Sequence, residues 1–166
     1  MQEIILNKAK ELVKLLNERN MTITFAESCT GGLCAANITR VDGASAVFKG
    51  SVVTYSEQTK EKLAGVCPKT IEKYTVYSEN CALEMSLGSK KLIGADMALA
   101  LSGIAGPSGA TKTDPVGTVY ISLACESTHT CRRYVFDGDR DAVRSKAVLS
   151  AFEMAINYLT INEKEL

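Results

Sequence analysis

Residues 26–32, AESCTGG, place a carboxylate, two hydroxyls, a thiol and two glycines in one short segment. The segment follows residues 22–25, TITF, which look like a short buried strand. In open α/β sheets, ligands bind beyond the carboxyl ends of strands, where helix N-termini offer unpaired N–H groups. The segment therefore predicts a ligand site around a candidate nucleophile, Ser28. The remaining members of this site are Glu27, Cys29, Thr30, Gly31 and Gly32.

The same segment has a simpler interpretation as a helix cap, because Ser28 or Thr30 alone satisfies that need. It matches neither of the nucleotide-binding patterns GxGxxG and GxxxxGK[ST]. A cap, however, takes one residue, whereas here several reactive groups occur together with glycines that permit close approach of a ligand. Both interpretations stay open at the level of sequence.

Two further segments are candidates for the same crevice. Residues 101–107, LSGIAGP, end an apolar run of strand length, and we expect Ser102, Gly103 and Gly106 to face the ligand; a plain turn is the alternative. Residues 138–144, GDRDAVR, place Arg140 and Arg144 four positions apart in the first turns of a helix. Guanidinium groups there suit a phosphate or carboxylate, with a solvated charged face as the alternative.

A serine nucleophile needs a base, and the sequence offers few. The single histidine, His129, lies in a predicted hairpin connection, residues 126–129, and we expect it to be exposed. The best candidate is Lys60, which closely follows the strand that ends near Tyr55. An ordinary lysine titrates near pH 10.4 and is charged at neutral pH, so this role requires burial or a nearby cation such as Arg140. A solvated surface lysine is the alternative.

Periodicity and capping signals predict alternating strands and helices followed by a late hairpin. That order predicts a three-layer α/β/α sandwich with a mixed, mostly parallel sheet and a C-terminal β-hairpin. The expected helices cover residues 2–19, 30–39, 57–64, a short turn from Pro68, 79–93 and 139–162. The expected strands cover residues 22–26, 47–55, 97–104, 116–125 and 130–136.

Composition narrows the function classes. The chain has 166 residues, which suits one domain spanning residues 1–166, and its 19 basic residues balance its 19 acidic ones. We therefore expect no nucleic-acid partner. Apolar runs are too short for a membrane span, and the first twenty residues do not have the pattern of a signal peptide, so we expect a cytoplasmic protein. The six cysteines form no CxxC pair and only one histidine could join them, so we expect no metal site. We also expect no cofactor.

Five motifs occur in a characteristic order: AESCTGG, VVTYS with a lysine shortly after, SGIAGP, PVGTVY and GDRDAVR. Together they resemble the C-terminal domain of the CinA family, which includes the nicotinamide-nucleotide amidases, and the resemblance extends from about Glu11 to Leu159. It implies an amidohydrolase that converts nicotinamide mononucleotide to nicotinic acid mononucleotide and ammonia without a metal. It also implies that Ser28 is the nucleophile and Lys60 the base.

The remaining site residues follow from the same resemblance. Tyr55, Ser102 and the loop 103–106 would line the amide pocket, and from their charge Arg140 and Arg144 would hold the ribose phosphate. The expected partner is a small nucleotide, and a homodimer is expected only by analogy. Three alternatives stay open: a non-catalytic nucleotide-binding module, a competence-related interaction protein, and an amidase for a different amide.

Overall fold

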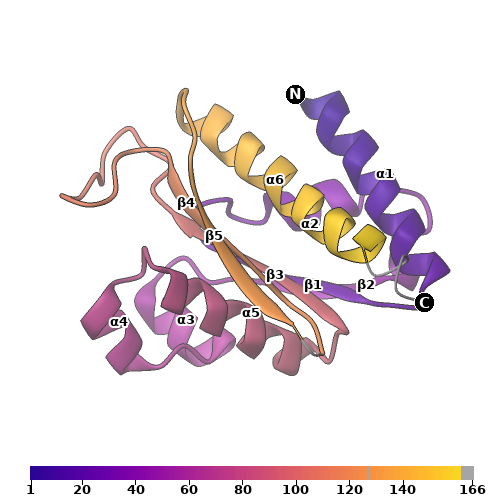
Figure 1. Ribbon diagram of the computed structural model, residues 1–166, viewed down its shortest axis with the longest axis horizontal. Coiled ribbons are helices and arrows are strands. Elements are labelled where there is room, and N and C mark those ends of the chain that lie inside the picture. The colour runs from indigo at the N-terminus through magenta and orange to yellow at the C-terminus, as the bar shows by residue number, and fades with distance from the viewer. Residues whose placement is uncertain (127, 162–166) are drawn as a thin grey trace.

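The computed structural model describes residues 1–126 and 128–161 of the chain (Figure 1). Its helices are α1 (Gln2–Glu18), α2 (Leu33–Ile38), the short 3-10 helix η1 (Ala44–Ala46), α3 (Glu57–Ala64), α4 (Pro68–Tyr74), α5 (Glu79–Ile93) and α6 (Arg140–Ile161). Its strands are β1 (Ile23–Glu27), β2 (Phe48–Val53), β3 (Met97–Gly103), β4 (Thr118–Ala124) and β5 (His129–Val135).

The five strands form one mixed sheet in the order β2-β1-β3-β4-β5. β1 pairs in parallel with β2 and β3, whereas β4 pairs antiparallel with both β3 and β5. Helices α1, α2 and α6 cover one face of the sheet, and α3, α4 and α5 cover the other (Figure 1). The predicted three-layer α/β/α sandwich is confirmed, and four of its five strands run in the same direction.

The late hairpin consists of β4 and β5 and is followed by α6. His129 was expected in the connection, but it is the first residue of β5 and pairs with Ala124. Its side chain is exposed, as expected. Two details of the predictions, residue 127 of the connection and residue 162 at the end of the last helix, lie outside the described residues.

The core is divided by the sheet into two unequal parts. The larger part lies between the sheet and helices α1 and α6, where the rings of Phe25 and Phe152 lie 6.0 Å apart. The smaller part lies under α5, where Ala26 and Ala100 of the sheet meet Met85. Because side chains alternate along a strand, β1 can present bulky Phe25 to one face and small Ala26 to the other. The small residues bring α5 close to the sheet.

Local signals set the bounds of the helix that carries Lys60. The Ser56 hydroxyl accepts a hydrogen bond from the Thr59 amide, and the Thr59 hydroxyl accepts one from the Ser56 amide, so α3 begins with a reciprocal cap. Gly65 ends the helix with a left-handed φ of 67°. These signals explain why the predicted bounds, 57–64, agree with the structure. They place Lys60 at the fourth position of α3.

Candidate active site

Ser28 lies directly beyond the carboxyl end of β1. Its amide donates to the carbonyl of Leu101 in β3 at 2.9 Å, so the neighbouring strand fixes its backbone. Only 7% of the residue is exposed. Parallel strands β1, β2 and β3 bring their carboxyl ends to the same edge of the sheet, which is where ligands bind in open α/β proteins.

Glu27 holds the turn that follows Ser28. Its carboxylate is fully buried and accepts hydrogen bonds from the amides of Gly32, Cys34 and Ala35 at 3.0–3.1 Å. A carboxylate at a helix N-terminus satisfies unpaired N–H groups and favours the helix dipole. Gly31 and Gly32 have φ values of 61° and 96°, so the turn delays α2 until Leu33, three residues later than predicted. Glu27 therefore contacts the protein backbone and does not line the cavity described below.

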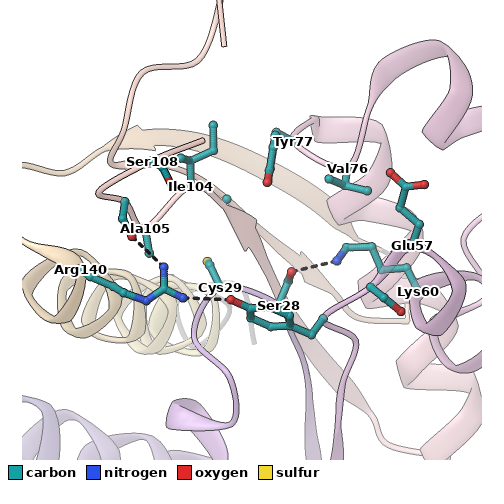
Figure 2. Close-up of a pocket in the computed structure, with 14 residues that line it drawn as sticks. Ser28, Cys29, Glu57, Lys60, Val76, Tyr77, Ile104, Ala105, Ser108 and Arg140 are labelled. Carbon is teal, nitrogen blue, oxygen red and sulfur yellow. Dashed lines mark hydrogen bonds between the residues drawn. The ribbon is translucent and has the colours of Figure 1, made fainter. Parts of the chain in front are cut away.

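Lys60 reaches Ser28 from the opposite side of the crevice. Its amine lies 2.8 Å from the Ser28 hydroxyl and 2.7 Å from the carbonyl oxygen of Thr54 (Figure 2). The residue is only 1% exposed, and this burial lowers the pKa of the Lys60 amine below its ordinary value. A neutral amine has one lone pair for the serine O–H and N–H groups for the carbonyl, so it fits both partners.

The charges around the amine only partly offset the effect of burial: Cys81, Cys29 and Glu57 raise the pKa of Lys60, but together they do so less than burial lowers it. The thiols of Cys29 and Cys81 interact electrostatically with Lys60. Burial raises the pKa of each thiol to about 11. Both thiols are therefore uncharged at neutral pH. The amine lacks a hydrogen-bonded carboxylate among the described residues, so burial decides the direction of its pKa shift.

A cavity of about 300 Å³ opens beside the serine and the lysine. This volume lies at the lower end of the range for small-molecule sites. Its walls come from the ends of β1, β2 and β3 and from the first turns of α3 and α6 (Figure 2). The lining residues are Ser28, Cys29, Tyr55, Ser56, Glu57, Lys60, Val76, Tyr77, Gly103, Ile104, Ala105, Gly106, Ser108 and Arg140.

Arg140 ties two walls of the cavity together. Its guanidinium donates to the carbonyl of Gly106 at 2.8 Å and to the hydroxyl of Tyr55 at 2.9 Å. Arg144 lies one turn further along α6 and donates to the carbonyl of Thr30 at 2.9 Å. Only Arg140 lines the cavity. The structure therefore separates the two arginines, with Arg144 bracing the turn after Ser28.

The predicted site residues fall into two groups. Ser102 is fully buried and donates to the carbonyl of Val76 at 2.7 Å, so it positions the segment between α4 and α5. Nine predicted residues line the cavity: Ser28, Cys29, Tyr55, Lys60, the loop residues Gly103, Ile104, Ala105 and Gly106, and Arg140. Six lie outside its lining: Glu27, Thr30, Gly31, Gly32, Ser102 and Arg144.

Sequence reasoning did not identify five lining residues: Ser56, Glu57, Val76, Tyr77 and Ser108. Ser56 and Glu57 directly follow Tyr55, so adjacency was an available signal. Val76 and Tyr77 come from the connection between α4 and α5, which the sequence does not link to the nucleophile. Their place depends on how α5 packs on the sheet.

Two structural observations concern alternative chemistries. His129 pairs with Ala124 at the edge of the sheet opposite to Ser28, because β4 begins beside the end of β3. Within residues 1–126 and 128–161, no three His, Cys, Asp or Glu side chains gather as metal ligands.

Across the part of the chain that the structure describes, no helix has the length and apolar character needed to cross a bilayer.

The fold and this site define an α/β protein with a buried serine–lysine pair at the carboxyl edge of its sheet. The model of the CinA C-terminal domain matches residues 6–159, and the chain therefore belongs to this family. A CinA-like protein of Thermotoga neapolitana is 49% identical over 142 residues, covering 86% of this chain and 35% of the relative. A putative competence-damage inducible protein of Acetivibrio thermocellus is 44% identical, covering 88% of this chain and 35% of the relative.

Solved structures agree with the fold. A CinA superfamily protein of Klebsiella pneumoniae superposes with a TM-score of 0.91 at 34% identity, covering 94% of this chain and 98% of that one. The competence/damage inducible protein of Agrobacterium tumefaciens gives a TM-score of 0.89 at 32% identity, covering 93% of this chain and 96% of that one. The chain spans about a third of the length of the curated relatives it matches.

Proposed function

We propose that this chain is an amidohydrolase that converts nicotinamide mononucleotide to nicotinic acid mononucleotide and ammonia, with Ser28 as nucleophile and Lys60 as base. The observation that carries the proposal is the 2.8 Å separation of the Lys60 amine and the Ser28 hydroxyl beside an open cavity. A nucleophile within hydrogen-bond reach of its base is the defining arrangement of this class of catalysis.

The chemistry follows from the positions of the two groups. The neutral Lys60 amine takes the proton of the Ser28 hydroxyl as its oxygen attacks the carboxamide carbon. The resulting lysine ammonium returns the proton to the leaving nitrogen, the C–N bond breaks, and ammonia departs. Water, deprotonated by the same amine, then attacks the ester carbon and releases the carboxylic acid with Ser28 restored.

Backbone amides would stabilise the negative oxygen of the tetrahedral intermediate. The Gly31 amide donates to the Ser28 carbonyl, and the Ile104 amide donates to the Thr118 carbonyl. Among the lining residues, the amides of Cys29, Ala105 and Gly106 have no main-chain or side-chain oxygen as acceptor within the described ranges. Removal of one donor to an oxyanion typically lowers kcat by about 10²–10³-fold. We assign the oxyanion to this group of amides.

The far end of the cavity suits the phosphate of the substrate. Arg140 lines the cavity and presents a guanidinium group, whose planar donors match phosphate oxygens. Its bonds to Tyr55 and Gly106 hold it in place before a ligand arrives. Arg144 is occupied with Thr30 and Asp141, so its contribution to phosphate binding is indirect.

The experiment measures ammonia release from nicotinamide mononucleotide, nicotinamide riboside and glutamine, side by side and with and without a chelator. We expect turnover of the mononucleotide, insensitive to chelator and lost in Ser28→Ala and Lys60→Ala. Lys62→Ala, which removes an exposed lysine of the same helix, is the matched control and should keep full activity. Binding of the mononucleotide without ammonia release would instead support a non-catalytic nucleotide-binding module, and loss of activity with chelator would contradict the metal-free mechanism.

A further inference from the structure

Tyr77 lines the cavity, and the serine–lysine chemistry does not use it. It lies in the connection between α4 and α5, far in sequence from Ser28. Figure 2 shows Tyr77 across the cavity from Ser28, with its hydroxyl oxygen directed toward the cavity and with Arg140 and Lys60 on either side. Tyr77 thus belongs to the wall along which a ligand lies if it reaches from Ser28 to Arg140.

The chain around Tyr77 is fixed before any ligand binds. The buried Ser102 hydroxyl donates to the Val76 carbonyl at 2.7 Å, and the Ser78 hydroxyl donates to the Thr75 carbonyl at 2.9 Å. The Tyr77 amide donates to the Thr75 hydroxyl at 3.2 Å. Thr75 has a φ of 67°, which is rare for a β-branched residue and persists only where surrounding contacts enforce it. The segment therefore presents the Tyr77 side chain in one position.

The Tyr77 hydroxyl is a polar group of the lining that the protein leaves to a ligand. Three other lining hydroxyls are bonded inside the protein: Ser28 to Lys60, Tyr55 to Arg140 and Ser56 to Thr59. Across the described residues, the hydrogen bonds of Tyr77 involve only its main chain. The residue is half-buried, whereas Ser108, whose hydroxyl is likewise without a partner in the described ranges, is exposed. Because a hydroxyl covered without a partner is costly, a ligand that fills the cavity should offer a polar atom to Tyr77.

The proposed substrate has one part that fits this position. Its carboxamide lies at Ser28 and its phosphate at Arg140, so the pyridinium ring and then the ribose lie between these two ends. The ring presents C–H groups, and its nitrogen carries the bond to the ribose and has no lone pair. The ribose presents two neighbouring hydroxyls, which donate and accept hydrogen bonds as a tyrosine hydroxyl does. Between the two ends of this ligand, only the ribose can pair with the Tyr77 hydroxyl.

We propose that Tyr77 is a specificity-determining residue whose hydroxyl binds a ribose hydroxyl of the nucleotide substrate. This inference rests on the proposed function and deepens it, because it names ribosylated carboxamides as the substrate class that this wall selects. A hydrogen bond between two neutral groups contributes modestly, because both groups bond to water before they meet. The preference is accordingly about fivefold.

The test compares Tyr77→Phe with the wild type on nicotinamide mononucleotide and on its 2′-deoxy and 3′-deoxy analogues. The substitution keeps the ring and removes only the hydroxyl. We expect kcat/KM for the ribonucleotide to fall about fivefold, and kcat/KM for the analogue that lacks the bonded hydroxyl to change less than about twofold. Loss of the effect together with the substrate hydroxyl identifies direct pairing. Tyr74→Phe, which removes the hydroxyl of an exposed tyrosine at the end of α4 and outside the lining, is the matched control and should leave all values unchanged.

The inference is overturned if Tyr77→Phe leaves the ribonucleotide unchanged, or lowers kcat/KM equally for the ribonucleotide and both deoxy analogues. The proposed function stands in either case, because ammonia is still released. If the wild-type protein releases ammonia from none of the three nucleotides, the proposed function fails, and calorimetric Kd values then decide the inference separately. Weaker binding of the ribonucleotide in Tyr77→Phe, with no such change for one deoxy analogue, supports the assignment. Equal changes for all three nucleotides, no change, or no binding overturns it.

Discussion

Replacement of Lys60 by methionine tests the chemistry with little change of shape. The lysine is fully enclosed, and methionine has a similar length without the amine. General-base catalysis typically contributes a factor of about 10²–10⁴ in rate. We therefore expect kcat for ammonia release to fall by at least about 10²-fold. Because the serine and lysine act as one unit, adding Ser28→Ala should lower the residual rate little further.

The substitution should leave the protein folded. Loss of the amine removes the hydrogen-bond donor to the Thr54 carbonyl, and a buried unsatisfied carbonyl costs about 1–3 kcal/mol. Removal of a buried amine offsets part of this loss, because burial of that group is itself unfavourable. The free energy of unfolding of a domain is typically about 5–15 kcal/mol, so the variant stays native at 25 °C.

The pH dependence of stability provides an independent check on the same variant. Burial lowers the folded pKa of Lys60, so between that pKa and 10.5 the unfolded chain binds more protons than the folded one. In the wild type, the cost of burying the charged Lys60 amine therefore falls as the pH rises through this window and is gone above 10.5. The free energy of unfolding rises correspondingly over the same window. Lys60→Met should flatten this slope.

The assay is ammonia release from nicotinamide mononucleotide, together with urea unfolding curves across pH. Lys62→Met, on the exposed side of α3, is the control and should retain the wild-type rate and slope. A Lys60→Met variant that is folded and keeps more than a tenth of the wild-type kcat would refute the role of this amine.

Three further outcomes follow. The kcat/KM of the wild type should rise with pH through the folded pKa of Lys60, which burial places below 10.5, and a rise centred at or above 10.5 would contradict a buried base. Arg140→Ala should raise KM for the mononucleotide about tenfold, as loss of a charged hydrogen bond does, with little change for the riboside, whereas Arg144→Ala should affect both substrates alike. In Gly88→Ala the new Cβ would lie 1.7 Å from the Ala64 carbonyl oxygen, so α3 and α5 must separate, and chemical denaturation should show the free energy of unfolding lowered by about 3 kcal/mol. The control is Gly43→Ala, whose Cβ meets no atom within 4 Å. Because Gly43 has a positive φ, this control should lose about 1 kcal/mol.

The fold was predictable where local signals and long-range packing agree. Ser56 and Gly65 fix both ends of α3, and Ser78 and Gly94 do the same for α5. The nearly continuous apolar run of β3 predicted a strand covered on both faces, and all seven of its residues are buried. The start of α2 was predicted too early, because the capping carboxylate of Glu27 acts from within β1, outside the usual cap position.

The site was less predictable than the fold, because contacts across the chain decide it. A sequence pattern shows that Lys60 follows a strand, but its burial depends on α5 packing over α3. Arg140 and Arg144 lie on the same helix with the same charge, and only the three-dimensional structure assigns one to the cavity and the other to Thr30. Ser102 likewise turns toward Val76, a contact over 26 positions of sequence.

The most direct measurement of the central claim is mass spectrometry of the protein quenched during its first turnover of nicotinamide mononucleotide. Ser28 and Cys29 are adjacent, and both line the cavity, so the site of the acyl group must be located within their shared peptide. The uncharged state of the Cys29 thiol at neutral pH and the amine at Ser28 predict an acyl group on the Ser28 oxygen. An acyl group on Cys29, or a burst of one ammonia per protein with no adduct, would contradict the account.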